Sequence, residues 1–165
     1  MSGPGVRART YSPDDRQACL AVFDTNVPGS FVAAEREQFE EFLDELPGPY
    51  LVLEDETGRV TACGGYAIAP GSTTADLCWG MVARDRQGTG LGRMLVEIRV
   101  ALCCRDSSVI DAALKTSQHT RLFYEKLGFR TERVVPNGIA PGLDSCEMRM
   151  FIVRGQFPDN RPGDS

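Results

Sequence analysis

The sequence predicts a single α/β domain built on a mixed, mostly antiparallel sheet of about six to seven strands with helices on its faces. Three observations support this prediction. The chain has 165 residues, 42% of them apolar and 25% charged, which suits one globular domain with a real core. Strand-like and helix-like patterns follow one another in the order β-α-α-β-β-β-α-β-α-β-β. A strand-helix-strand unit over residues 74–114 requires one parallel pair joined by a right-handed crossover.

The N-terminal part predicts one strand and two helices. Weak alternation indicates a strand over residues 6–11. Ser12, a proline and two aspartates favour a helix start directly after it, and an apolar stripe extends that helix to about Asn26. Residues 33–46 predict a second helix, because four apolar side chains recur there on one face while the acidic residues fall mostly elsewhere.

The rest of the chain predicts six strands and two helices, with Gly128 as a helix C-cap. The strands are expected in a hairpin over 50–68 and at 74–82, 108–114, 129–135 and 145–153, and the helices at 90–104 and 120–127. A loop rich in proline and glycine, 136–144, should join the last two strands. We therefore expect a domain over residues 1–154 and a loosely structured tail over 155–165.

Composition excludes several functional classes. The net charge of −5 argues against broad nucleic-acid binding and slightly favours a cationic partner. No apolar run is long enough for a membrane span, and the first residues lack the apolar stretch of a secretion signal. The six cysteines form no CxxC pair and there is one histidine, so we expect no metal site. Free thiols in apolar stretches suit a reducing, cytoplasmic compartment.

The junction between the strand at 74–82 and the next helix carries three alternating glycines, Gly88, Gly90 and Gly92. A helix N-terminus offers unpaired N–H groups and partial positive charge, and glycines let an anion approach the backbone. The pattern predicts a phosphate site. It lacks the GK[ST] ending of a Walker loop and the third glycine of a dinucleotide fingerprint.

The stretch QGTGLG at 87–92 resembles the pyrophosphate loop of the GNAT acetyltransferase superfamily. A second stretch, TSQHTRLFYEKLGF at 116–129, is similar to that superfamily's second motif, a strand end followed by a helix with YEKxGF. Motif spacing and element order match over about residues 9–151. The resemblance implies a GNAT-like fold with a central, splayed parallel pair, and an enzyme that transfers acetyl from acetyl-CoA to a primary amine.

The resemblance also implies which residues bind acetyl-CoA. Backbone N–H groups of the glycine loop would hold the pyrophosphate, and the pantetheine arm would lie along the strand before it, in the gap of the splayed pair. The implied residues are Gly80, Met81, Val82, Gln87, Gly88, Thr89, Gly90, Leu91, Gly92, Arg93, Ser117 and Tyr124. Ser117 stands where many members carry an asparagine, and a serine is shorter.

Three residues receive catalytic roles from the resemblance. The N–H of Gly80 would bind the thioester oxygen, and Tyr124 would protonate the departing thiolate. Asp76 would act as the base that neutralises the amine, through a bridging water because about 13 Å of strand separates it from Gly80. Ordinary alternatives are a strand glycine, a core-edge tyrosine and a solvated strand-end aspartate. Cys78 is the residue that would permit an acyl-enzyme instead, and we expect His119 to be solvated.

The acceptor is expected opposite the CoA, between the first two helices and the last two strands, where Asn26, Phe31 and Asp144 are candidate contacts. It could be a small metabolite, an antibiotic-like amine, or a peptide N-terminus or lysine. Two other functions stay open: a non-catalytic acyl-CoA-binding module, and an acyltransferase for a longer acyl-CoA or an oxygen acceptor. The sequence also leaves open whether the protein is a monomer or a homodimer.

Overall fold

The computed structural model of the chain describes residues 5–154, so the predicted tail at 155–165 lies outside the described residues. All described strands belong to one seven-stranded sheet in the order β1-β2-β3-β4-β5-β7-β6. Every neighbouring pair is antiparallel except β4 and β5, which are parallel. The predicted mixed sheet with one central parallel pair is confirmed.

The elements of the first half are β1 (Val6–Thr10), α1 (Arg16–Thr25), α2 (Arg36–Glu45), β2 (Tyr50–Asp55) and β3 (Val60–Ala67). Short 3-10 turns, Pro13–Asp15 and Ala33–Glu35, lead into α1 and α2. The elements of the second half are β4 (Thr74–Val82), α3 (Leu91–Cys103), β5 (Asp111–Ser117), α4 (Arg121–Lys126), β6 (Arg130–Ala140) and β7 (Leu143–Phe151).

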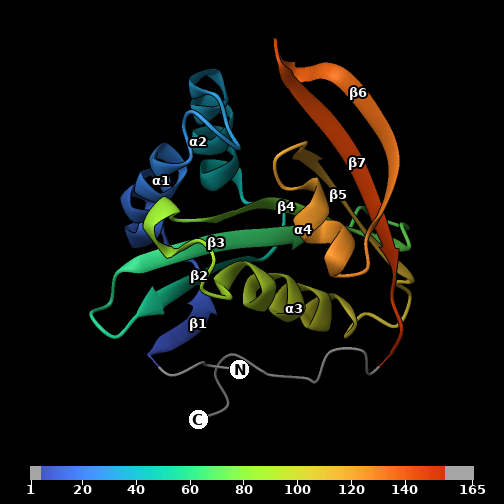
Figure 1. The fold of residues 1–165 in the computed structure, drawn as a ribbon. Helices are drawn as coiled ribbons and strands as arrows, with labels where there is room; N and C mark the ends of the chain where they lie inside the picture. The colour runs from blue at the N-terminus through green and yellow to red at the C-terminus, as the bar shows by residue number, and fades with distance from the viewer. Residues whose placement is uncertain (1–4, 155–165) are drawn as a thin grey trace.

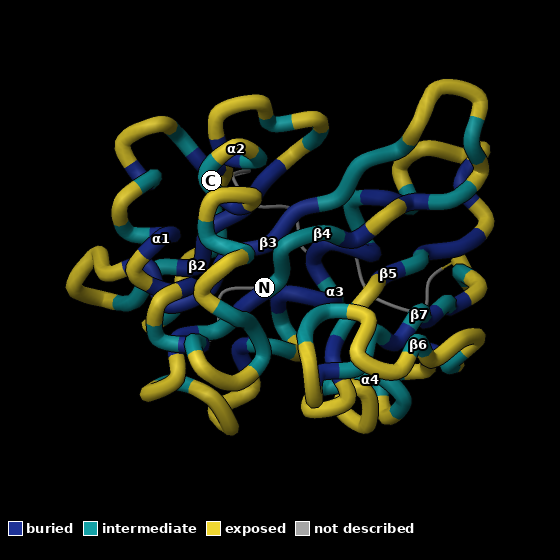
Figure 2. Tube along the Cα trace, turned by 90° about the horizontal axis from the view of Figure 1, so that it is seen from above, coloured by how far each residue is buried: buried dark blue, intermediate teal, exposed yellow. Residues whose placement is uncertain are grey.

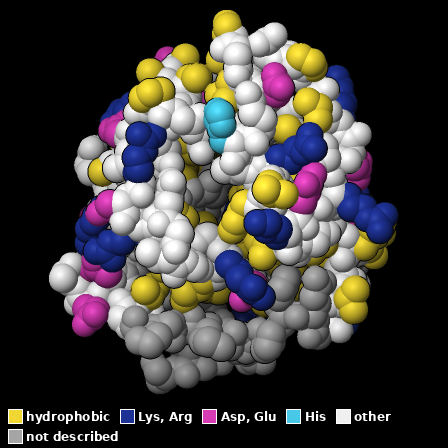
Figure 3. All heavy atoms as spheres, in the orientation of Figure 1, with side chains coloured by type: hydrophobic (Ala, Val, Ile, Leu, Met, Phe, Trp, Pro, Cys, Tyr) yellow, Lys and Arg dark blue, Asp and Glu magenta, His cyan; other side chains and the backbone are white. Residues whose placement is uncertain are grey.

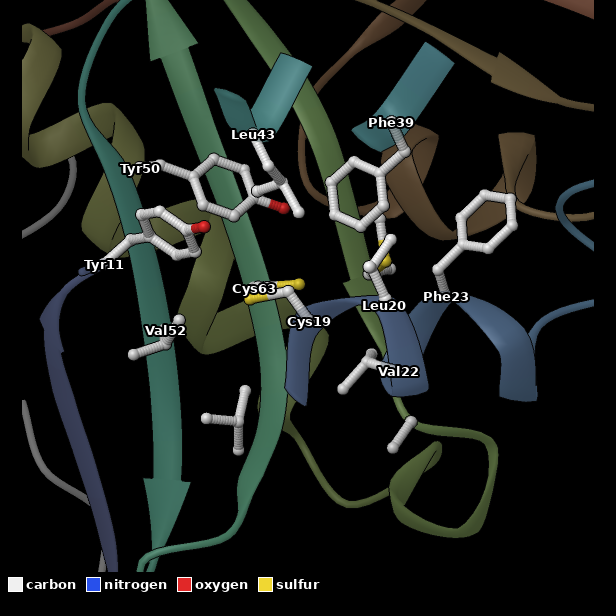
Figure 4. Close-up of a cluster of buried hydrophobic side chains, with 13 residues drawn as sticks. Tyr11, Cys19, Leu20, Val22, Phe23, Phe39, Leu43, Tyr50, Val52 and Cys63 are labelled. Carbon is white, nitrogen blue, oxygen red and sulfur yellow. The ribbon is translucent and has the colours of Figure 1, made fainter. Parts of the chain in front are cut away.

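The helices cover opposite faces of the sheet. Helices α1 and α2 pack on β2, β3 and β4, and Figure 4 shows Cys19 of α1 beside Cys63 of β3 and Leu43 of α2 beside the Tyr50 ring. Helix α3 covers the other face, and α4 joins it over β5 and β7. The buried segments in Figure 2 accordingly run through the central strands and along α3, while the outer loops are exposed. No helix in the described part of the chain is long and apolar enough to cross a membrane.

Strands β4 and β5 separate after a short contact. They pair only from Thr74 to Asp76, opposite Asp111 to Ala113, although each strand continues beyond this point. The two halves of the sheet consequently diverge, with α1 and α2 beside one half and the long β6–β7 hairpin in the other (Figure 1). The predicted splay of the parallel pair is therefore confirmed.

Buried Asp111 connects neighbouring strands at the point where β4 and β5 separate. Its carboxylate accepts hydrogen bonds from Thr74 Oγ1 on β4 at 2.6 Å and from Arg149 Nη1 on β7 at 2.7 Å. These contacts tie three strands together where the sheet begins to open. Because the carboxylate is almost completely shielded from solvent, its hydrogen bonds are stronger than they would be at the surface.

Two predicted boundaries were wrong. Strand β5 begins at Asp111 and not at residue 108, because residues 106–109 form a turn in which the Val109 N–H bonds to the Asp106 carbonyl. Residues 136–144 are largely strand and not a loop, since β6 runs to Ala140. Pro136 is tolerated because β6 is an edge strand, and the register irregularity between Val135 and Ala140 absorbs the extra residues.

The predicted start of the first helix depends on Asp15. Its carboxylate accepts the Ser12 N–H at 2.8 Å and binds both terminal nitrogens of Arg9 at 2.7 Å. The Nε atom of Arg9 also donates to Glu54 on β2 at 3.0 Å. Asp15 thereby anchors the start of α1 to β1 and β2, and the hydrogen bonds from Arg9 lower its pKa.

Replacing Asp15 with asparagine should destabilise the protein by about 1–3 kcal/mol, since the amide has no charge to pair with Arg9 and only one oxygen left to accept the hydrogen bonds from Arg9 and Ser12. Urea unfolding at pH 7 measures the loss, and exposed Asp14→Asn is the matched control. A lowered pKa adds stability that is complete above the ordinary carboxyl range and disappears as the pH falls through the folded value. The difference between wild type and variant should therefore shrink from pH 7 to pH 3, and a constant difference would contradict the assignment.

Candidate active site

Strand β4 carries a bulge where it runs alone beside the gap. Cys63 pairs with Met81 and Gly65 with Cys78, so two β4 residues, Trp79 and Gly80, lie opposite one residue of β3. Trp79 adopts a left-handed backbone with φ of 46°, which costs roughly 1–3 kcal/mol for a residue with a side chain. The Tyr50 hydroxyl donates to the Trp79 carbonyl at 2.9 Å and holds the bulge in place.

The bulge alters which β4 side chains share a face. In a regular strand, Asp76, Cys78 and Gly80 would lie on the same face. A side chain at Gly80 would instead point toward Arg99 of α3, on the other face of the sheet. Asp76 is exposed on the face away from α3, because its neighbours on β4 are buried in the cluster with α3. Its carboxylate forms no ion pair or hydrogen bond with another described residue. Asp76 and Gly80 are thus separated both along the strand and by face.

The glycine loop is exposed and open. Gly88 and Gly90 have φ values of 77° and 90°, and a Cβ atom at either position would meet nothing within 4 Å. Gly90 is the N-cap of α3, so the unpaired N–H groups of Leu91, Gly92 and Arg93 follow it directly. An anion can therefore approach this backbone without steric hindrance. The Arg93 guanidinium also pairs with Glu97 at 2.7 Å on the same helix.

The two sequence motifs meet at this helix start. A Cβ on Gly92 would lie 3.1 Å from the ring of Phe123, so glycine lets α4 approach the first turn of α3. Tyr124 follows on α4, and its ring contacts those of Phe123 and Phe129 edge-on. The Tyr124 hydroxyl makes no hydrogen bond with another described residue and is free to donate.

The end of α4 fixes the position of Tyr124. Gly128 has φ of 106°, its N–H bonds to the Glu125 carbonyl, and the Phe129 N–H bonds to the Tyr124 carbonyl. This pair of bonds is the Schellman motif expected of a glycine C-cap. Before α4, buried Ser117 accepts the His119 N–H at 3.3 Å, while the His119 side chain is exposed. Ser117 therefore shapes the turn into α4.

Asn26 is buried and its amide group is fully engaged. Its nitrogen donates to the carbonyls of Val22 and Val82, and its oxygen accepts from the Gln87 side chain at 2.8 Å. Asn26 thus connects α1 to the end of β4 and to the first residue of the glycine loop. In this arrangement it holds the loop and has no group left for an acceptor.

The Cys78 thiol is largely protonated near neutral pH. Burial raises its pKa to about 11, even though the charge of Arg99 acts in the opposite direction. A thiol is a poor nucleophile until it ionises. The site therefore gives no support to an acyl-cysteine intermediate.

Aromatic rings line the side of the bulge that faces α1 and α2. The Trp79 ring stacks on Phe31 with centroids 5.9 Å apart and on Phe39 at 5.0 Å. Phe31 and Trp79 are only partly buried, so part of this wall faces solvent. Figure 3 shows the molecule hollowed near the centre of the face seen there.

Asp144 and Glu35 differ in whether their carboxylate oxygens are free to bind an acceptor. The Asp144 carboxylate accepts the Asn137 N–H at 2.9 Å and is thereby used inside the β6–β7 hairpin. Glu35, in the turn before α2, was not predicted. Its Oε2 atom is buried without a hydrogen-bond partner among the described residues, and burial raises its pKa. A sequence signal existed, since Glu35 follows Phe31 in the expected acceptor region, but acidic residues are common there.

Within residues 5–154, no group of three or more histidine, cysteine, aspartate or glutamate side chains is arranged to hold a metal ion. The chemistry available here is that of backbone N–H groups, a free phenol and two carboxylates. This set suits proton transfer and stabilisation of an oxyanion.

Comparison with known proteins identifies the family. The family profile described as "Acetyltransferase (GNAT) domain" matches residues 47–131. A protein from Desulfovibrio desulfuricans, described as an acetyltransferase of the GNAT family, is 26% identical with a TM-score of 0.76, covering 90% of this chain and 99% of its own.

Two further structures share the fold. An aminoglycoside 6′-N-acetyltransferase complexed with coenzyme A is 17% identical with a TM-score of 0.72, covering 88% of this chain and 97% of its own. A spermidine N-acetyltransferase variant from Vibrio cholerae is 15% identical with a TM-score of 0.70, covering 90% and 95%. A comparison with curated proteins gives no match. On the family profile, which spans just over half of the sequence, this chain belongs to the GNAT acetyltransferase family.

Proposed function

We propose that the protein is an acetyl-CoA-dependent N-acetyltransferase that acetylates a primary amine by direct attack. The observation that carries the proposal is the unpaired edge of β4. Beyond Asp76, no described strand pairs with the side of β4 that faces β5. That edge leads directly into the open glycine loop at the start of α3. An extended, amide-containing chain ending in a pyrophosphate is the ligand that matches this combination.

The residues present fit coenzyme A. Backbone N–H groups from Gly88 to Arg93 would hold the pyrophosphate, and the β4 edge at Gly80, Met81 and Val82 would bind the pantetheine arm. The aminoglycoside acetyltransferase with the same fold is complexed with coenzyme A, which supports this assignment. Acetyl-CoA supplies the acetyl group as a thioester, whose carbonyl carbon is open to attack by an amine.

Three groups of this chain would then handle charge and protons. The Gly80 N–H donates to the oxygen that becomes negative when the amine attacks, a contact worth roughly 3 kcal/mol. Tyr124 donates its phenolic proton to the departing sulfur, since this hydroxyl has no competing partner among residues 5–154. Asp76 accepts the amine proton through water, because the strand geometry keeps its carboxylate away from Gly80.

The acceptor is proposed to be a cationic amine that contacts the face between the aromatic wall and α2. The buried Glu35 oxygen lacks a partner, and an ammonium group would satisfy it. Phe31 and Trp79 offer ring faces that suit either a cation or an apolar body. The net charge of −5 and the spermidine and aminoglycoside acetyltransferases of the same fold agree with a cationic acceptor.

Gly90→Glu should abolish acetyl-CoA binding, because it places a carboxylate where the pyrophosphate would lie. Isothermal calorimetry measures the affinity. Gly71→Glu is the matched control: Gly71 also has a positive φ, 77°, and open space around it, but lies in the β3–β4 loop. We expect the control to bind like wild type. Equal binding by Gly90→Glu and wild type would remove the loop from the cofactor site.

Tyr124→Phe should lower kcat about 10- to 100-fold with little change in acetyl-CoA affinity, since only the proton donor is lost. Thiol release, followed against a panel of amines, gives kcat. Tyr66→Phe removes a phenol from the same hydrophobic cluster and should be neutral. An unchanged rate in Tyr124→Phe would exclude it as the acid. Tight acetyl-CoA binding without turnover on any amine would favour the binding module.

Glu35→Gln should lower kcat/KM for the amine about tenfold while KM for acetyl-CoA stays constant.

The same variant should be more stable than wild type at pH 7. Because burial raises the pKa of the Glu35 carboxyl, its ionisation destabilises the folded state at a pH above that pKa. This destabilisation is absent at a pH below the pKa of the carboxyl in the unfolded chain. The gain in Tm should therefore disappear near pH 4. Exposed Glu37→Gln on α2 is the control, and equal amine kinetics in both variants would refute the assignment.

A further inference from the structure

Arg99 is a charged residue in the middle of the protein core. It lies on α3, is 1% exposed, and is the largest of the fully buried side chains. Its guanidinium donates to the carbonyls of Leu95 and Gly65, both at 3.3 Å. No carboxylate in the described part of the chain forms an ion pair with it. Arg99 is therefore a buried cation held by neutral acceptors.

The guanidinium lies directly against the β4 bulge. A Cβ on Gly80 would be 2.7 Å from Nη2 and 3.0 Å from Nη1 of Arg99. A Cβ on Gly64, opposite the bulge on β3, would be 3.2 Å from its Cζ and 3.1 Å from the Gly80 Cα. Both positions must be glycine for the cation to fit. The backbone of the bulge and the charge of Arg99 are consequently in contact.

Stability does not account for this arrangement. A buried charge without a counter-ion is unfavourable, and replacing buried ions by apolar side chains of similar volume is often neutral or stabilising. The charge also acts beyond its contacts, because it opposes the rise in the pKa of Cys78 on β4. Its field therefore reaches the strand that borders the gap.

We propose that Arg99 is a positioning residue for acetyl transfer: its buried charge stabilises the negative oxygen that forms at the Gly80 N–H. This inference rests on the proposed function. The charge is fixed before the reaction and is shielded from water, the conditions under which electrostatic stabilisation is most effective. It acts through the Gly80 peptide, against which the guanidinium lies on the α3 side of β4. The hydrogen bond to Gly65 keeps the cation at this peptide.

Arg99→Met tests the charge with nearly the same length of side chain, and Arg99→Lys restores the charge. We expect Arg99→Met to fold with a Tm at least equal to wild type, to lose about 10- to 100-fold in kcat, and to keep its KM for acetyl-CoA. Arg99→Lys should recover most of the loss. Ile98→Val, which alters packing on the same helix without changing charge, should leave kcat unchanged. If Arg99→Met does not fold, Arg99→Gln provides the same comparison.

A second measurement does not need turnover. Infrared difference spectra of bound acetyl-CoA with a ¹³C-labelled thioester carbonyl report how strongly that bond is polarised. The band should shift to lower frequency in wild type and Arg99→Lys, and the shift should shrink in Arg99→Met.

The outcomes separate the two proposals. An Arg99-dependent band with no amine acetylated would overturn amine acetylation as the function, while showing that the charge of Arg99 polarises the bound thioester. Normal transfer with equal band positions and equal kcat in Arg99→Met and wild type would overturn the role of Arg99 alone. Failure of wild type to bind acetyl-CoA would overturn both.

Discussion

The site depends on the early separation of β4 from β5. Both strands continue well beyond their contact, yet this parallel pair shares only three residue positions. Asp111 locks the point of separation by bonding Thr74 and Arg149 from the strands on either side. The bulge at Trp79 then bends β4 away and is held by the Tyr50 hydroxyl. An unpaired strand edge next to an open helix N-terminus follows directly from these contacts.

Neighbouring contacts then align the loop with this edge. Asn26 bonds the carbonyl of Val82 and the side chain of Gln87, so α1 fixes both the last residue of β4 and the first residue of the glycine loop. Gly92 admits Phe123, which brings the helix with Tyr124 against the start of α3. Two segments more than twenty residues apart thereby border one gap. The glycine loop and the segment with Tyr124 therefore belong to one site, although they are separate in the sequence.

Local signals predicted most of the fold and the outline of the site. Apolar periodicity identified the helices, and the unit over 74–114 predicted the parallel pair because its topology permits little else. Gly90 was singled out by the alternating glycines at the strand-to-helix junction, and Gly128 by its place after an expected helix, where a C-cap favours glycine. Two boundaries failed for different reasons: β5 starts late because a local turn over residues 106–109 precedes it, and Pro136 stays in a strand because that strand lies at the edge of the sheet. Asn26 and Asp144 could not be placed because their partners are distant in sequence.

Arg99 shows what periodicity conceals. It occupies the apolar face of α3, four residues after Leu95, where a charged side chain contradicts the pattern. In the sequence alone, a buried arginine at this position looks the same as one whose long side chain reaches solvent. Only the sheet topology, which places Gly64 and Gly80 side by side over this helix, creates a space that a guanidinium fills. The strained Trp79 and the buried cation lie at the bulge, and the partnerless Glu35 lies in the turn before α2, the helix whose Phe39 stacks on Trp79. Such costs are expected where a protein gives up stability for chemistry, so their occurrence around β4 supports the proposal that the reaction takes place beside this strand.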